Sequence, residues 1–84
     1  MTPPERREAI RLHRFEAVES YQKYEAVQVR IEAMEKAARD KFGPQVDGVE
    51  LRNHQPYKDL CGDRERHMKV ATLHALMAMM LKEA

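Results

Sequence analysis

The feature that most constrains this chain is a stretch of 38 residues, 5–42, that contains neither Gly nor Pro. Before it, Thr2 can cap a helix, Pro occupies the first helical position, and Glu5 stands at the capping-box spacing from Thr2. After it, a Gly-Pro pair at 43–44 ends a helix, because Gly favours a left-handed cap and Pro blocks continuation. The sequence therefore predicts one helix of about 38 residues within 3–42, about 57 Å long at 1.5 Å per residue.

The second half of the chain divides into a connecting segment and a shorter helix. Residues 43–62 hold all three Gly and two of the four Pro, which predicts a loop with a short helical turn near 56–61. Asp63 follows a Gly and is a good N-cap, so a second helix is expected over 63–82. The loop is long for a compact domain, so part of it should pack against the helices. Its expected anchors are Leu51, Tyr57 and Leu60.

Apolar residues recur at three- and four-residue steps along the first helix, which predicts the face that packs against the second helix. Leu12, Phe15 and Val18 lie off this stripe, so the first half of the helix is apolar on more than one side. The predicted stripe comprises Ile10, Ala17, Tyr21, Tyr24, Val27, Ile31, Met34, Ala38 and Phe42.

The second helix is predicted to be strongly amphipathic. Small residues on one flank, Ala71, Ala75 and Ala78, allow another helix to approach closely. The broad apolar face of this helix comprises Val70, Leu73, Leu76, Met77, Met80 and Leu81.

The two predicted helices differ in length, and this difference predicts self-association. A second helix of about 20 residues is about 30 Å long and covers the first helix only over residues 22–42. Burying the remaining apolar side chains is worth about 25 cal/mol per Å², and a second copy is the most economical cover. The predicted fold is therefore all-α, a single domain over 1–84, in which a long helical hairpin with a coiled-coil seam pairs as a four-helix bundle in a homodimer. The residues assigned to this interface, with self or partner, are Ile10, Leu12, Phe15, Val18, Tyr21 and Met79.

The charges of the chain nearly balance. Lys and Arg number 15 and Asp and Glu number 14, so a net charge of +1 provides no global field for nucleic acid or anionic lipid. A local excess near the start of the first helix could still contact phosphates, although no helix-turn-helix pattern accompanies it. An ion-paired, solvated terminus is the alternative. The residues of this possible nucleic-acid contact are Arg6, Arg7, Arg11 and Arg14.

No motif for catalysis or metal binding emerges from the potential ligands and nucleophiles. His54, Cys61, His67 and His74 have none of the compact zinc spacings, and the last two are about 10.5 Å apart along a helix. Cys61 precedes a predicted helix N-terminus, where its pKa could fall, but nothing pairs it with a base. Because a phosphate-binding Gly loop is also missing, we predict no enzyme activity, no metal site and no cofactor.

The remaining sequence features favour a protein that acts by binding other proteins. The lone Cys61 cannot form an internal disulfide, the first residues are charged rather than apolar, and the longest apolar run, 75–81, is too short to span a bilayer. A cytoplasmic location without membrane association is therefore expected. Surplus apolar surface without chemical motifs predicts a non-catalytic interaction or assembly module: an adaptor, small regulator or inhibitor. Met79, off the main apolar face, fits a dimer interface and a groove of another protein equally well.

Overall fold

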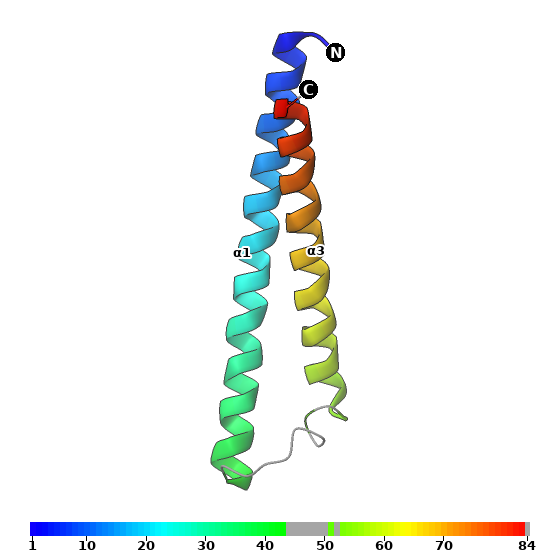
Figure 1. The fold of residues 1–84 in the computed structure, drawn as a ribbon. Coiled ribbons are helices and arrows are strands. Elements are labelled where there is room, and N and C mark those ends of the chain that lie inside the picture. The colour runs from blue at the N-terminus through cyan, green and yellow to red at the C-terminus, as the bar shows by residue number, and fades with distance from the viewer. Residues whose placement is uncertain (44–50, 52, 84) are drawn as a thin grey trace.

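The computed structural model describes residues 1–43, 51 and 53–83. Two helices, α1 (Pro3–Phe42) and α3 (Gln55–Glu83), run antiparallel and form a hairpin (Figure 1). No strand occurs among the described residues, so the prediction of an all-α helical hairpin is confirmed. The body measures 59 × 17 × 16 Å, and the end of α3 lies beside the first turns of α1 (Figure 1).

Both ends of α1 are determined by local hydrogen bonds. The backbone N–H of Glu5 donates to Oγ1 of Thr2 over 3.4 Å, and the backbone N–H of Thr2 donates to Oε1 of Glu5 over 3.3 Å, which completes a capping box. The hydrogen bond from the Thr2 hydroxyl, and then that from its backbone, lower the pKa of Glu5. At the other end, Gly43 has φ of 91°, and its N–H donates to the Arg39 carbonyl over 2.8 Å. Helix α1 has the bounds that its sequence predicts.

The second helix begins at Gln55, eight residues before the predicted start, so the predicted loop through residue 62 is too long. Pro56 lies in the first turn, where a helix does not need its missing N–H. Gly62 lies inside the helix at a cost of about 1 kcal/mol relative to Ala, which contacts along the preceding turns offset. The one-turn helix expected at 56–61 is part of α3. The expected anchors Leu51, Tyr57 and Leu60 are all half-buried.

The core of the hairpin is a narrow seam. Val27 and Ile31 of α1 and Ala71 and Ala78 of α3 are its buried apolar residues, and Ser20 is buried beside them. Alternating three- and four-residue steps connect these residues to half-buried ones, which is the pattern of an antiparallel coiled coil. The half-buried seam residues are Ile10, His13, Ala17, Tyr24, Met34 and Ala38 of α1, and Tyr57, Leu60, Arg64, His67, His74 and Leu81 of α3.

The observed seam differs from the predicted stripe in its composition. Tyr21 and Phe42 were placed on the packing face of α1, but both are exposed, whereas His13 and Ser20 take part in the seam. A seam keeps facing one partner helix when its residues recur every 3.5 positions on average. His13 and Ser20 satisfy this repeat, whereas Tyr21 and Phe42 do not. On α3 Ala71 and Ala78 of the predicted Ala flank face α1, where small side chains let the helix axes approach closely, whereas Ala75 is exposed.

The structure corrects the prediction that the second helix is too short to cover the start of α1. With 29 residues α3 is about 44 Å long, and it reaches the level of His13, so the two helices differ less than predicted. Ile10 is accordingly half-buried. Leu12, Phe15 and Val18 are still half or more exposed, because they point away from α3 rather than beyond its end.

Two Gly-to-Ala variants test whether Gly62 lies inside α3 rather than in a loop before it. A Cβ at Gly62 meets open space in a helical backbone, so Gly62→Ala should stabilise the protein by about 1 kcal/mol. Gly43→Ala should instead destabilise it, because an L side chain is strained at φ of 91°. Thermal unfolding followed by circular dichroism measures both, and equal shifts of Tm in the same direction would contradict the assignment of Gly62 to the helix interior.

A second pair of variants tests the position of the seam. Ile31 is 1% exposed and Val29, two residues away on the same helix, is 64% exposed. We expect Ile31→Ala to lower the free energy of unfolding by about 2–4 kcal/mol, the usual cost of a buried cavity, and Val29→Ala to change it by about 0.5 kcal/mol or less. Urea titration provides both values, and similar costs at the two positions would place the seam elsewhere.

Candidate interaction surfaces

Three polar contacts connect the two helices along the seam. Nδ1 of His13 lies 2.9 Å from Nδ1 of His74 near the termini. The Arg64 guanidinium donates to Oε1 of Gln28 over 2.9 Å midway along the hairpin. Because these groups find partners only in one alignment of the helices, they fix its register.

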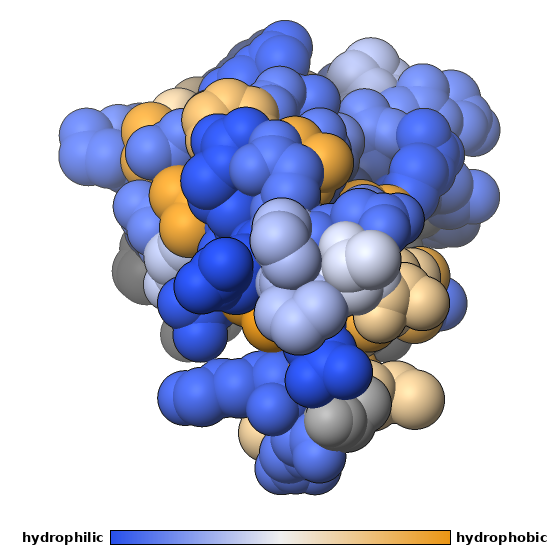
Figure 2. Space-filling view, turned by 90° about the horizontal axis from the view of Figure 1, so that it is seen from above, coloured by the Kyte–Doolittle hydropathy of each residue, from blue (hydrophilic) through white to orange (hydrophobic). Residues whose placement is uncertain are grey.

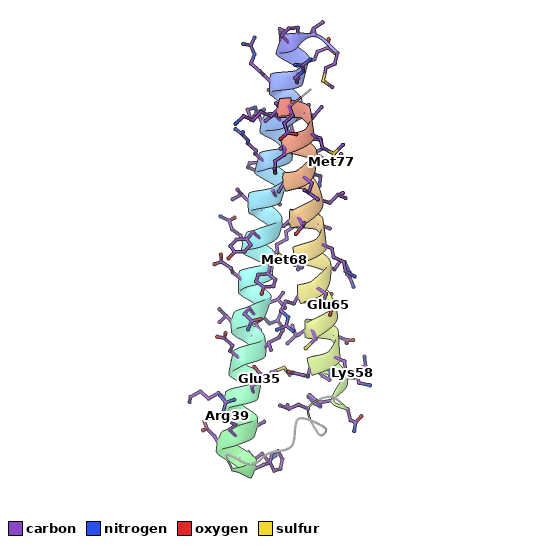
Figure 3. All side chains as sticks on the ribbon, in the orientation of Figure 1. Glu35, Arg39, Lys58, Glu65, Met68 and Met77 are labelled. Carbon is purple, nitrogen blue, oxygen red and sulfur yellow. The ribbon has the colours of Figure 1, made fainter. Side chains whose placement is uncertain are left out.

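The third contact lies near the connecting segment. The Tyr57 hydroxyl donates to Oε2 of Glu35 over 3.3 Å. Partial burial, followed by the proximity of Cys61 and Glu35, raises the pKa of Tyr57, so the phenol keeps its proton and remains a donor. Figure 3 places Glu35 on the same end of the hairpin as Lys58. Cys61 is a free, half-buried thiol within this structural contact.

The His pair was missed by the sequence reasoning, which considered His74 only with His54, Cys61 and His67. His13 occupies a seam position, and the alternation of three- and four-residue steps would have revealed it. Among the described residues, no three His, Cys, Asp or Glu side chains come close enough together to hold a metal ion. His54 is exposed and His67 is half-buried in the seam.

The largest exposed apolar side chains of α3 form a continuous surface, which we call the α3 apolar face. Its members recur at steps of three and four residues, as in the seam itself, and Met80 is 69% exposed. Figure 3 shows Met77 on the part of α3 that lies beside the first turns of α1. Viewed from this end, apolar side chains emerge on more than one side of the body (Figure 2). The face consists of Val70, Leu73, Leu76, Met77 and Met80.

A basic hollow occupies the terminal end of the hairpin. It measures about 360 Å³, with Ile10 as its only apolar lining residue. Arg11 is paired with Glu8 through hydrogen bonds of 2.6 and 3.0 Å, and this contact lowers the pKa of Glu8. Arg6, predicted to act with the other arginines, is half-buried and does not line the hollow. The cations around the hollow are Arg7, Arg11 and Arg14 of α1 and Lys82 of α3.

The basic hollow and the α3 apolar face lie on opposite sides of the seam. Counting about 100° per residue from the seam, Arg7 and Arg14 project to one side of α1, and Lys82 projects to the same side of antiparallel α3. Val18, Tyr21 and Met79 fall on this side too, and the Tyr21 ring stacks on Tyr24 with centroids 5.8 Å apart. Val70, Leu73, Met77 and Met80 project to the other side, together with Leu12, while Phe15 faces directly outward. The predicted interface residues thus belong to more than one surface.

Neither helix carries an apolar stretch that could cross a lipid bilayer, over the residues that the structure describes. No protein-family model, curated protein or solved structure matches the chain significantly.

The His pair generates a prediction about proton positions. Two Nδ1 atoms 2.9 Å apart form a hydrogen bond only when one of them carries a proton and the other accepts. We therefore expect one ring of the pair His13 and His74 to be the Nδ1–H tautomer and the other the Nε2–H tautomer at neutral pH. Long-range ¹H–¹⁵N NMR of the imidazoles distinguishes the two forms, with His54 as an exposed reference. Identical tautomers in both rings would show that the contact does not form.

Proposed function

We propose that this protein is a non-catalytic protein-interaction module that works as a homodimer. In this proposal the α3 apolar faces of two copies pack together, and the two hairpins form a four-helix bundle. One observation carries the proposal: over residues 70–80 the exposed face of α3 holds Val, Leu and Met side chains, whereas its seam with α1 in the same stretch is lined by Ala71, His74 and Ala78. This apolar surface thus has no cover from the residues that the structure describes, and burial of such surface is the main force in association.

The dimensions of the hairpin support a need for cover. Its accessible surface is 6476 Å², whereas about 5200 Å² is typical of a folded monomer of this mass. The radius of gyration is 18.1 Å, whereas about 12 Å is typical of a compact chain of this length. A second copy beside the first would thicken the body and shield the exposed face.

The α3 apolar face runs from Val70 to Met80, about 15 Å along the helix, and would form the centre of the interface rather than all of it. The whole long side of the body, 59 by 17 Å, offers about 1000 Å², compared with roughly 800 Å² per partner in a standard interface. The three- and four-residue steps from Val70 through Leu73 and Met77 to Met80 match the left-handed packing of four-helix bundles. Because a two-fold axis pairs the same surface on both copies, this one stripe can be self-complementary.

The biological role that fits such a dimer is that of an adaptor, small regulator or inhibitor in the cytoplasm. Its activity would consist of bringing helix faces to other proteins without bond-making chemistry. The alternative, a nucleic-acid-associated regulator, draws its support from the basic hollow, where three of the four arginines expected to contact phosphates come together.

The dimer is tested by polar substitution within the α3 apolar face. Sedimentation equilibrium at micromolar concentration should give twice the chain mass of 9.9 kDa for the natural protein. Leu73→Gln combined with Met77→Gln should yield monomers, because Gln keeps helix propensity but removes the apolar contact. Val29→Gln, on an exposed position of α1 away from this face, is the matched control and should remain dimeric.

Two results would contradict the proposal. One is a natural protein that sediments as a monomer, and the other is a double variant that remains dimeric with unchanged affinity. Circular dichroism of the double variant confirms that its helices still form, so that a loss of mass reflects dissociation rather than unfolding.

A further inference from the structure

We infer that the side of the hairpin opposite the α3 apolar face is a docking site for an acidic amphipathic helix of another protein. We call this side the basic face. It deepens the proposed function, because it assigns a partner class to a surface that the dimer leaves open. The basic face comprises Arg7, Ile10, Arg11, Arg14, Val18, Tyr21, Met79 and Lys82.

Most cations of the basic face have no carboxylate partner among the described residues. Within the described residues, Arg7, Arg14 and Lys82 have no ion-pair partner, and only Arg11 is paired, with Glu8. These cations come from both helices and surround one hollow, so carboxylates placed there would contact several of them at once. Arginine binds carboxylates through two parallel hydrogen bonds, which gives the site directional preference for Asp and Glu.

The apolar members of the face indicate that the partner is an amphipathic protein segment. Ile10 lines the hollow together with the cations, Met79 is exposed one turn before Lys82 on α3, and Val18 and Tyr21 continue the face along α1. From Arg7 to Tyr21 the site extends about 21 Å, which is the length of a helix of about 14 residues. A helix seated along the groove between α1 and α3 would place apolar residues against these side chains and acidic residues beside the cations.

The same observations disfavour a nucleic acid as the occupant. Binding to phosphate backbones is dominated by the number of cations, and this chain has a net charge of only +1. Five acidic residues, Glu5, Glu8, Glu16, Glu19 and Glu83, lie on the same terminal end of the hairpin and would repel an extended polyanion. A short helix that contacts only the hollow and the neighbouring apolar side chains avoids most of this repulsion.

The test measures binding of a designed 14-residue peptide with four Leu on one helical face and Glu on both flanks. Fluorescence anisotropy of the labelled peptide should show saturable binding to the natural protein, weakened by added salt. Arg7→Gln, Arg14→Gln and Lys82→Gln together should weaken it about tenfold or more. The charge-matched control, Arg30→Gln, Arg39→Gln and Lys58→Gln, should bind like the natural protein, because these residues lie outside the basic face.

Further probes distinguish docking of an acidic helix from binding of a nucleic acid or a lipid surface, and from dimerisation. A peptide with Lys in place of Glu should not bind. Equal or tighter binding of a 15-nucleotide single strand, or of vesicles with one-third phosphatidylserine, would overturn the inference, as would no binding of the acidic peptide. The Leu73→Gln, Met77→Gln variant should bind the acidic peptide with unchanged affinity per chain. The double variant therefore tests dimerisation, and the triple variant of the basic face tests docking, so that either proposal can fail without the other.

Discussion

The structure depends on a narrow seam in which a few large apolar side chains, together with small and polar ones, hold two long helices together. Ala71 and Ala78 lie against α1 where a bundle usually has Leu or Ile, and Ile31 is its most deeply buried large side chain. Small side chains let the helices approach closely but bury little apolar area, and buried area sets most of the stabilisation. The seam therefore sets the alignment of the two helices but contributes only modest stabilisation. The larger apolar side chains remain available for other contacts.

Alignment within this seam comes from polar groups at three levels. The His13–His74, Gln28–Arg64 and Glu35–Tyr57 pairs are distributed over residues 13–35 of α1, about 33 Å of the hairpin. A slip of one helical turn would leave several of these groups without partners in a partly desolvated seam, which costs more than the bonds themselves contribute. An apolar seam of Ala residues alone would tolerate such a slip. Fixed alignment matters for function because each outer surface of the hairpin combines residues from both helices.

The sequence predicts α1 well because its signals are local: the Thr2–Glu5 capping box at one end and Gly43 at the other. It fails at the start of α3, because Pro56 is compatible with the first turn of a helix as well as with a loop, and Gly62 is a local helix breaker that tertiary contacts override. It also fails to choose between two stripes on α3, since the Ala stripe and the Val70–Met80 stripe have the same periodicity. Periodicity shows that a face will be buried, but only the structure shows what it meets. The repeat of three- and four-residue steps is enough to place His13 in a seam, but not to show that it meets His74, 61 positions away.

Two differently built surfaces on one thin body suggest a division of tasks. An apolar face without charges, such as that on α3, gains affinity from area and suits a permanent partner such as a second copy. A face that mixes cations with a few apolar side chains selects partners with complementary charges, because a charge left unpaired in an interface costs binding free energy. Such a face suits a transient partner. Because the two surfaces lie on opposite sides of the seam, association through one need not obstruct the other. A dimer built in this way would present two basic faces, and a protein carrying two acidic helices would bind both with the added strength of a bivalent contact.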